Sequence, residues 1–175
     1  MQTITLGGGC FWCIESAFNK VEGVVKAESG YSNGSKPSPT YEEVCSGSTG
    51  HAEVVQVSFD PERLSLREVL EIFFALHDPT QLNRQGNDIG TQYRSGIYYH
   101  SPEQKDAAEQ IIKEMVEDET WSTPIVTEVE EVSNYYPAET YHQGYFESNP
   151  QNQYCAMVVG PKLAKFKKTF ASKLK

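Results

Sequence analysis

Hydrophobic and polar residues follow two kinds of spacing along this chain, one typical of strands and one typical of helices. Short alternating runs predict strands at residues 3–6, 54–59, 96–100 and 125–132. Apolar residues at helical spacing predict a helix over residues 10–19 and two longer helices that begin after Ser65 and Ser101. Ser65 forms a capping box with Glu68, and Pro102 occupies the first position after Ser101.

The predicted elements follow the order strand, helix, strand, strand, helix, strand, helix, strand. This order is typical of an α+β fold, and we expect a two-layer sandwich of helices on a mixed sheet, with the split βαβ core of a ferredoxin-like plait. Long loops rich in Gly, Ser, Pro and Asn cover residues 30–50 and 80–95, and residues 134–150 form a mostly irregular segment. Loops of this length in a compact domain are usually functional.

Composition and charge narrow the class of protein. With 175 residues, 38% of them hydrophobic, the chain has the size and composition of a single globular domain over residues 1–175. Its net charge of −9 disfavours a nucleic-acid partner, because phosphate binding requires a positive field. Six lysines lie near the C-terminus among apolar residues at helical spacing, which predicts a docked amphipathic helix: Leu163, Phe166, Phe170 and Leu174.

The cellular setting follows from what the sequence lacks. No apolar run approaches the roughly 18 residues that span a bilayer, and residues 1–6 lack the layout of a secretory signal. We therefore expect a cytoplasmic monomer without a membrane partner. In the cytoplasm thiols stay mostly reduced, so the four cysteines suggest catalysis or metal binding before a disulfide framework: Cys10, Cys13, Cys45 and Cys155.

The strongest chemical signal is Gly-Gly-Gly-Cys-Phe-Trp-Cys at residues 7–13, where a predicted strand turns into a helix. The N-terminus of a helix favours an anion, so this position is expected to lower the pKa of Cys10 from its ordinary value of about 8.5. The glycines would let a substrate approach closely, and Phe11 and Trp12 would form an apolar wall beside the thiol. The alternative is that the two cysteines and two aromatic residues simply fill the core.

These residues resemble the active-site motif of the A-type peptide methionine sulfoxide reductases, in Gly9-Cys10-Phe11-Trp12. Further blocks resemble the same family in the same order and cover most of the chain: Thr40 to Gly47, Thr49 to Glu53, Gly86 to Ser95, Tyr136 to Glu139, and His142-Gln143. His51, His142 and Tyr145 also lie in matching blocks, where a role in the substrate pocket and ordinary packing are both open. Cys45 lies in one of these blocks, and buried structure is the favoured interpretation.

The resemblance implies roles for residues that are uninformative alone. Reduction of a sulfoxide requires attack at sulfur while the oxygen gains a proton. By resemblance Cys10 is the nucleophile and Glu53 the acid, and a place in the pocket would raise the pKa of Glu53 from about 4.3. Tyr41 and Tyr93 correspond to hydroxyl donors to the sulfoxide oxygen, and Asp88 to an acidic residue that supports them. The resemblance also implies the S epimer as substrate.

The same resemblance implies how the enzyme is regenerated. Attack leaves a sulfenic acid on Cys10, which a second thiol converts to a disulfide. Cys155, in a segment expected to be flexible, resembles the resolving cysteine of the family, and Cys13 is the rival. No cysteine follows Cys155, unlike in members with two cysteines in the tail, so a thioredoxin-like reductant acts on Cys10–Cys155 directly or through Cys13. No cofactor or metal is implied beyond this external thiol.

Two other classes of function remain open from the sequence. Cys10-x-x-Cys13 has the spacing of a thioredoxin-like thiol-disulfide exchanger, although the glycine run and the lack of a preceding βαβ pattern argue against it. A non-catalytic metal-binding module would use the cysteines with His51 or His142. A second Cys-x-x-Cys pair or a close pair of histidines, which would complete such a zinc site, is missing.

Overall fold

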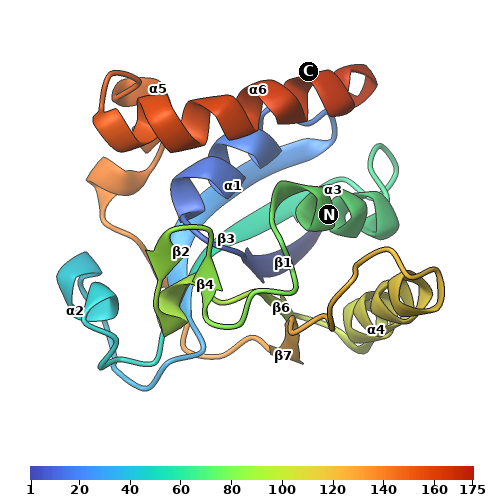
Figure 1. Ribbon diagram of the computed structural model, residues 1–175, viewed down its shortest axis with the longest axis horizontal. Coiled ribbons are helices and arrows are strands. Elements are labelled where there is room, and N and C mark those ends of the chain that lie inside the picture. Colours follow the sequence, from blue (N-terminus) through green and yellow to red (C-terminus); the bar gives the residue numbers. More distant parts are fainter.

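The computed structural model describes all 175 residues and places one six-stranded sheet among helices (Figure 1). In spatial order the strands are β7 (Glu128–Glu131), β6 (Gly96–Tyr99), β1 (Gln2–Gly7), β3 (Ala52–Phe59), β2 (Val24–Ser32) and β8 (Tyr136–Pro137). Neighbouring strands are antiparallel except β6 and β7, which are parallel. The prediction of an α+β fold with a mixed sheet is confirmed.

Two helices connect strands that are not neighbours in the sheet. Helix α1 (Phe11–Asn19) joins β1 to β2, and β3 lies between those two strands. Helix α3 (Leu66–Leu76) joins β3 to β6, and β1 lies between them. Because β1 and β3 are antiparallel, the end of β1 and the start of β3 lie at the edge of the sheet from which α1 begins, and the glycine-rich motif lies there.

The hydrophobic core fixes this junction. One cluster of 29 buried residues links the sheet to α1 and α3, and Phe18, Val57 and Phe73 in it are fully buried. Near the end of β1 the polar Thr5 is also fully buried, so both faces of that strand are covered. Burial of one large apolar side chain contributes roughly 1.5–3 kcal/mol. The turn from β1 into α1 is thus held between packed layers.

The helix starts predicted from local sequence are present. Ser65 and Glu68 form a reciprocal capping box at the start of α3. Ser101 accepts a hydrogen bond from the Gln104 N–H at the start of α4 (Pro102–Glu117), with Pro102 in the first turn. Near the C-terminus α6 (Gly160–Thr169) buries Leu163 and Phe166 and leaves its lysines exposed, as expected of a docked amphipathic helix. Figure 1 shows α6 running across α1.

The predicted bounds of one strand and one loop differ from the structure. Strand β7 covers four residues rather than 125–132, because it pairs only with the four-residue β6. The predicted loop over 30–50 begins inside β2 and contains a further helix, α2 (Tyr41–Cys45). Elements this short are stabilised mainly by tertiary contacts, so no periodic pattern of apolar residues predicts them.

The remaining short elements lie in the other two predicted loops and in the C-terminal segment. They are β4 (Arg84–Gln85), β5 (Asp88–Ile89), η1 (Thr91–Tyr93), η2 (Thr140–His142), α5 (Tyr145–Ser148), η3 (Cys155–Val159) and η4 (Ala171–Lys173). The segment η3 is π-helical and runs directly into α6. None of the helices combines the length and the apolarity needed to cross a membrane.

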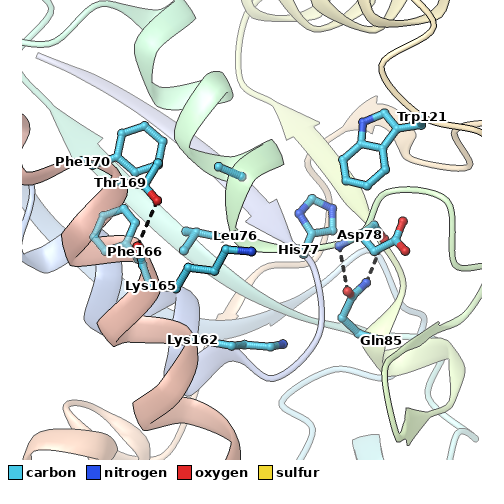
Figure 2. Close-up of a pocket in the computed structure, with 11 residues that line it drawn as sticks. Leu76, His77, Asp78, Gln85, Trp121, Lys162, Lys165, Phe166, Thr169 and Phe170 are labelled. Carbon is cyan, nitrogen blue, oxygen red and sulfur yellow. Dashed lines mark hydrogen bonds between the residues drawn. The ribbon is translucent and has the colours of Figure 1, made fainter.

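A large cavity of about 480 Å³ lies between the end of α3 and α6 (Figure 2). Leu76 and Phe166 form part of its apolar lining, and Figure 2 shows Lys162 and Lys165 reaching into it from α6. No cysteine lines this cavity. The thiol chemistry suggested by the sequence therefore belongs to a different and smaller cavity.

Replacement of Ser65 by Ala removes the acceptor for the Glu68 N–H, which lies 3.1 Å from the serine oxygen. Loss of such a cap is expected to lower the free energy of unfolding by about 1 kcal/mol. Urea unfolding followed by far-UV circular dichroism measures the difference. The matched control is Ser172→Ala at an exposed position near the C-terminus, and equal losses in the two variants would contradict the capping assignment.

Candidate active site

The turn from β1 into α1 requires glycine for steric reasons. Gly9 has φ of +86°, in the left-handed region that disfavours side chains, and its N–H donates to the Tyr93 carbonyl oxygen at 3.2 Å. A Cβ atom on Gly9 would lie 2.8 Å from the Gln85 side chain, and one on Gly8 would lie 2.8 Å from the His77 ring. The glycines thus let two neighbouring segments pack against the backbone that leads to Cys10.

Cys10 occupies the N-cap position of α1 and is partly exposed in a cavity of about 280 Å³. The other residues that line this cavity come from four separate parts of the chain: Trp12, Tyr41, Asp88, Tyr93, Asn152 and Tyr154. Trp12, Tyr41, Asp88 and Tyr93 were singled out from the sequence. The fold therefore brings five of the predicted site residues together, including Cys10.

Glu53 lies beside this cavity, near the start of β3, and only 1% of it is exposed. Its Oε1 atom accepts a hydrogen bond from the Phe11 N–H at 3.3 Å, while Oε2 has no hydrogen-bond partner. Burial and the nearby Asp88 raise the pKa of Glu53 to about 8, and the Phe11 N–H opposes that shift. The protonated acid is therefore the main form at pH 7. The expected rise in this pKa is confirmed.

The expectation of a lowered pKa for Cys10 is wrong. Burial raises the pKa of the thiol well above its ordinary value, and the charges of Glu53 and Asp88 raise it further. The Trp12 N–H at the start of the helix lowers it, but by less. A favourable helix end is worth about 0.3–1 kcal/mol, less than one pKa unit, whereas full burial shifts a pKa by up to about 3–5 units. In the resting protein the thiol therefore keeps its proton.

Two tyrosine hydroxyls are held as proton donors on the cavity wall. Burial and the charge of Glu53 raise the pKa values of Tyr41 and Tyr93 above their ordinary range, so both stay protonated. Tyr41 begins α2, and its backbone N–H donates to the Glu139 carboxylate at 3.0 Å. Across the cavity the Asp88 carboxylate accepts a hydrogen bond from the Tyr154 hydroxyl.

Aromatic rings surround the indole of Trp12. Tyr145 stacks on it with ring centroids 4.0 Å apart and planes 12° apart, and Tyr154 meets it edge-on at 5.9 Å. The Trp12 Nε1–H donates to Nδ1 of the buried His142 at 3.1 Å. Burial lowers the pKa of His142, so its ring is neutral and available as this acceptor. These contacts fix the orientation of the Trp12 indole in the cavity wall.

Phe11 is placed differently from the apolar wall expected beside the thiol. Its side chain is fully buried and does not line the cavity. The ring instead packs beneath Tyr41 and His142, with centroid distances of 6.4 and 5.4 Å. Phe11 therefore supports the site from below, and its backbone N–H contacts Glu53 directly.

The other thiols are less accessible than Cys10. Cys13 is 4% exposed, and burial raises its pKa to about 11. Cys155 is fully buried within the π-helical segment η3. Burial raises its pKa as well. The neighbouring Tyr154 lines the cavity together with Cys10, so the chain around Cys155 forms part of the cavity wall.

Two residues with open roles lie outside the cavity. His51 accepts the Gly34 N–H at Nδ1, and its Nε2 lies 2.7 Å from the Lys36 carbonyl oxygen, so it anchors the 34–36 loop. Cys45 ends α2 and is partly exposed, and burial raises its pKa. The structure contains no group of three or more His, Cys, Asp or Glu residues arranged to hold a metal ion.

Sequence analysis missed Tyr154 and Asn152, which line the cavity, and it gave no role to Glu139, which lies in a matched block and accepts the Tyr41 backbone N–H. The chain has ten tyrosines, so the type of residue 154 carried no signal of its own. Only its position before Cys155 in a segment already singled out for a mobile thiol marked it for attention. The role of Glu139 depends on a contact across 98 positions, which no local pattern reveals.

Comparisons with known proteins identify relatives over the whole chain. The family model described as peptide methionine sulfoxide reductase matches residues 2–174. The peptide methionine sulfoxide reductase MsrA of Trichodesmium erythraeum is 57% identical, over 97% of this chain and 96% of its own. The crystal structure of Mxr1 from Saccharomyces cerevisiae in reduced form is 41% identical, covers 88% of each chain and has a TM-score of 0.80. Mxr1 in complex with Trx2 is 30% identical, covers 82% of this chain and 84% of its own, and has a TM-score of 0.56.

Replacement of Glu53 by Gln is expected to shift the pH profile of Cys10 alkylation to lower pH. Above pH 8 the Glu53 carboxylate opposes ionisation of the thiol, and the amide removes that charge. Rates of reaction with iodoacetamide between about pH 6 and pH 10, with the labelled cysteine identified by mass spectrometry, measure the shift. Glu62→Gln, at an exposed position, serves as control. Equal alkylation rates for Glu53→Gln and the unmodified protein at every pH above 8 would show that the two groups are not coupled.

Proposed function

The chain belongs to the peptide methionine sulfoxide reductase family, and we propose that it reduces the S epimer of methionine sulfoxide, free or in proteins, with Cys10 as the nucleophile. The observation that carries the proposal is the shared cavity. A partly exposed thiol, two protonated phenols and an indole face open into it, and a protonated carboxyl group lies beside it. The S preference rests on the family alone.

In the first step the Cys10 sulfur attacks the sulfur of the sulfoxide. The Cys10 sulfur forms a bond to the sulfoxide sulfur and loses its proton, while the sulfoxide oxygen gains a proton from Glu53. The bond between that oxygen and the substrate sulfur then breaks as the oxygen bonds to the Cys10 sulfur. The products are methionine and a sulfenic acid on Cys10, so the thiol is oxidised by two electrons as the sulfoxide is reduced by two. The proton that Cys10 loses replaces the one that Glu53 gives up, so the step consumes no net proton.

Glu53 supplies the proton to the oxygen. A catalytic acid functions best when its pKa lies near the working pH, and burial holds the Glu53 pKa near 8. The unpartnered Oε2 atom is available to carry that proton. Hydroxyls of Tyr41 and Tyr93 donate hydrogen bonds to the same oxygen, as an oxyanion hole does, and Asp88 holds Tyr154 at the opposite wall.

The methyl group of the substrate rests on Trp12. A methyl group gains most from contact with a fixed apolar surface, and Tyr145 and His142 fix the indole. Phe11 contributes from beneath the site rather than by contact. His142 and Tyr145 thus act on the substrate through Trp12.

Regeneration proceeds through a disulfide. The Cys155 thiol attacks the sulfenic sulfur of Cys10, a disulfide forms and water leaves; Cys13 is the alternative resolving thiol. Because Cys155 is buried in η3, this step needs a rearrangement of that segment. A thioredoxin-like dithiol then reduces the disulfide, a proposal supported by the Mxr1 complex with Trx2. No prosthetic cofactor takes part in these steps.

The proposal extends to architecture and setting. The order β6, β1, β3, β2, with α1 and α3 as crossovers, supports a ferredoxin-like plait in a two-layer sandwich. One main core cluster supports a single catalytic domain over residues 1–175. A monomer in the cytoplasm remains our prediction from the sequence.

Replacement of Glu53 by Gln is expected to lower sulfoxide turnover by ~10²-fold or more, because the amide cannot protonate the oxygen, while Cys10 remains open to alkylation. Turnover is measured as methionine released from an S-sulfoxide peptide with excess dithiothreitol. Cys10→Ser should release none, and Glu62→Gln, at an exposed position, should match the unmodified protein. Near-normal turnover in Glu53→Gln removes the acid role, and turnover in Cys10→Ser removes the whole proposal.

A single turnover without reductant should leave a Cys10–Cys155 disulfide. Mass mapping of non-reduced peptides identifies the partner, and Cys155→Ser should instead accumulate sulfenic acid that dimedone traps. Cys45→Ser, which alters a thiol outside the cavity lining, is the control and should leave the map unchanged. A Cys10–Cys13 bridge in the unmodified protein would assign resolution to Cys13.

A further inference from the structure

The proposed chemistry leaves one buried carboxyl group unused. Glu15 lies in α1, one turn after Phe11, and only 2% of it is exposed. It does not line the cavity that contains Cys10. Both of its oxygens accept a hydrogen bond from the Gly144 N–H, each at 2.9 Å. Burial of a carboxyl group with a single backbone donor costs free energy of folding. A buried carboxyl group at this position therefore suggests a function.

Gly144 sits at the point where the C-terminal segment changes direction. It has φ of +65° and separates η2, which ends with His142, from α5, which begins with Tyr145. His142 accepts the Trp12 indole N–H, and Tyr145 stacks on the same indole. The conformation of Gly144 therefore sets how both residues meet Trp12.

Other contacts also tie this segment to β2 and to the end of α1. The Gln143 side chain bonds the backbone of Ser29, and Glu147 accepts from Ser16 and Lys20. Glu147 is 48% exposed through its side chain, so water competes for its bonds. Glu15 is the carboxyl group that reaches the turn itself from a buried position.

We propose that Glu15 is a positioning residue that fixes the Gly144 turn and so closes Tyr145 and His142 around Trp12, which sets the affinity for the substrate's methyl group. This inference rests on the proposed function of the site. It assigns Glu15 no contact with substrate and no part in proton transfer.

The ionisation of Glu15 gives the inference a second readout. Burial and the charge of Glu147 raise its pKa to about 7, while the Gly144 N–H, the Ser29 hydroxyl and Lys20 oppose the shift. Lys20, directly after α1, and Glu147 of α5 are the charged groups that face it. A carboxylate accepts an N–H more strongly than a neutral acid does. The turn is therefore held more firmly above pH 7 than below it.

The test is the substrate concentration at half-saturation in single turnovers with an S-sulfoxide peptide, where methionine release is followed by rapid quench. Glu15→Leu removes the acceptor at similar volume and should raise half-saturation about tenfold, the factor expected for loss of a hydrogen bond to a charged group. The rate at saturation should stay within about twofold, since Cys10 and Glu53 are untouched. Glu15→Gln keeps a carbonyl acceptor and should restore most of the affinity.

Two controls test whether the effect is specific to Glu15 and to its ionisation. Glu147→Gln removes a partly exposed carboxylate from the same interface and should leave half-saturation nearly unchanged. In the unmodified protein half-saturation should rise as pH falls from about 8 to about 6, and Glu15→Gln should remove that dependence. If Glu15→Leu does not fold, the pH comparison with Glu15→Gln decides alone.

An unchanged half-saturation in folded Glu15→Leu, or a pH dependence that survives in Glu15→Gln, overturns the positioning role and leaves the proposed function intact. An equal effect of Glu147→Gln also overturns it, because the interface as a whole would then be responsible. A lack of methionine release by the unmodified protein would instead remove the proposed function. The two failures are therefore distinguishable.

Discussion

The site depends on the burial of a thiol and a carboxyl group together at the start of one helix. The Phe11 N–H joins Glu53 of β3 to the first residue of α1, directly after Cys10. Glu53 is buried and the partly exposed Cys10 lies beside it, so burial opposes ionisation of both groups and the charge of Glu53 also opposes ionisation of Cys10. In the mechanism that we propose, two protons are thus held at a site where the sulfoxide oxygen needs one.

A feature of the structure can be predicted from the sequence when the residues that produce it are close together along the chain. The starts of α3 and α4 were predictable, since their caps consist of neighbouring residues. Helix α2 also starts with a capping box of neighbouring residues, Thr40 and Glu43, but its five residues are too few for an apolar period, and its first N–H is held by Glu139 across 98 positions. Likewise the fully buried position of Cys155 depends on packing of the C-terminal segment, while its composition alone favours a flexible loop.

The family motifs identified residues of the site, but they did not predict the pKa of Cys10. A helix-dipole argument assigned Cys10 a lowered pKa and omitted the larger effect of burial beside two carboxyl groups. The same burial was anticipated for Glu53, because a pocket position was already assumed for it. Glu15 is a further residue whose contact the sequence does not predict. It follows the motif by two residues, but only the fold shows that it accepts the Gly144 N–H.

A protonated resting thiol suits an enzyme whose substrate is itself a product of oxidation. Peroxides and other electrophiles react with thiolates, so a thiol with a raised pKa resists them when no substrate is bound. In the mechanism that we propose, a bound sulfoxide changes this balance, because protonation of its oxygen by Glu53 leaves positive character on the sulfur under attack. Reactivity at Cys10 then depends on the substrate itself. Such an arrangement would link activation of Cys10 to occupancy of the Trp12 surface, and would give selectivity for sulfoxides without a permanently reactive cysteine.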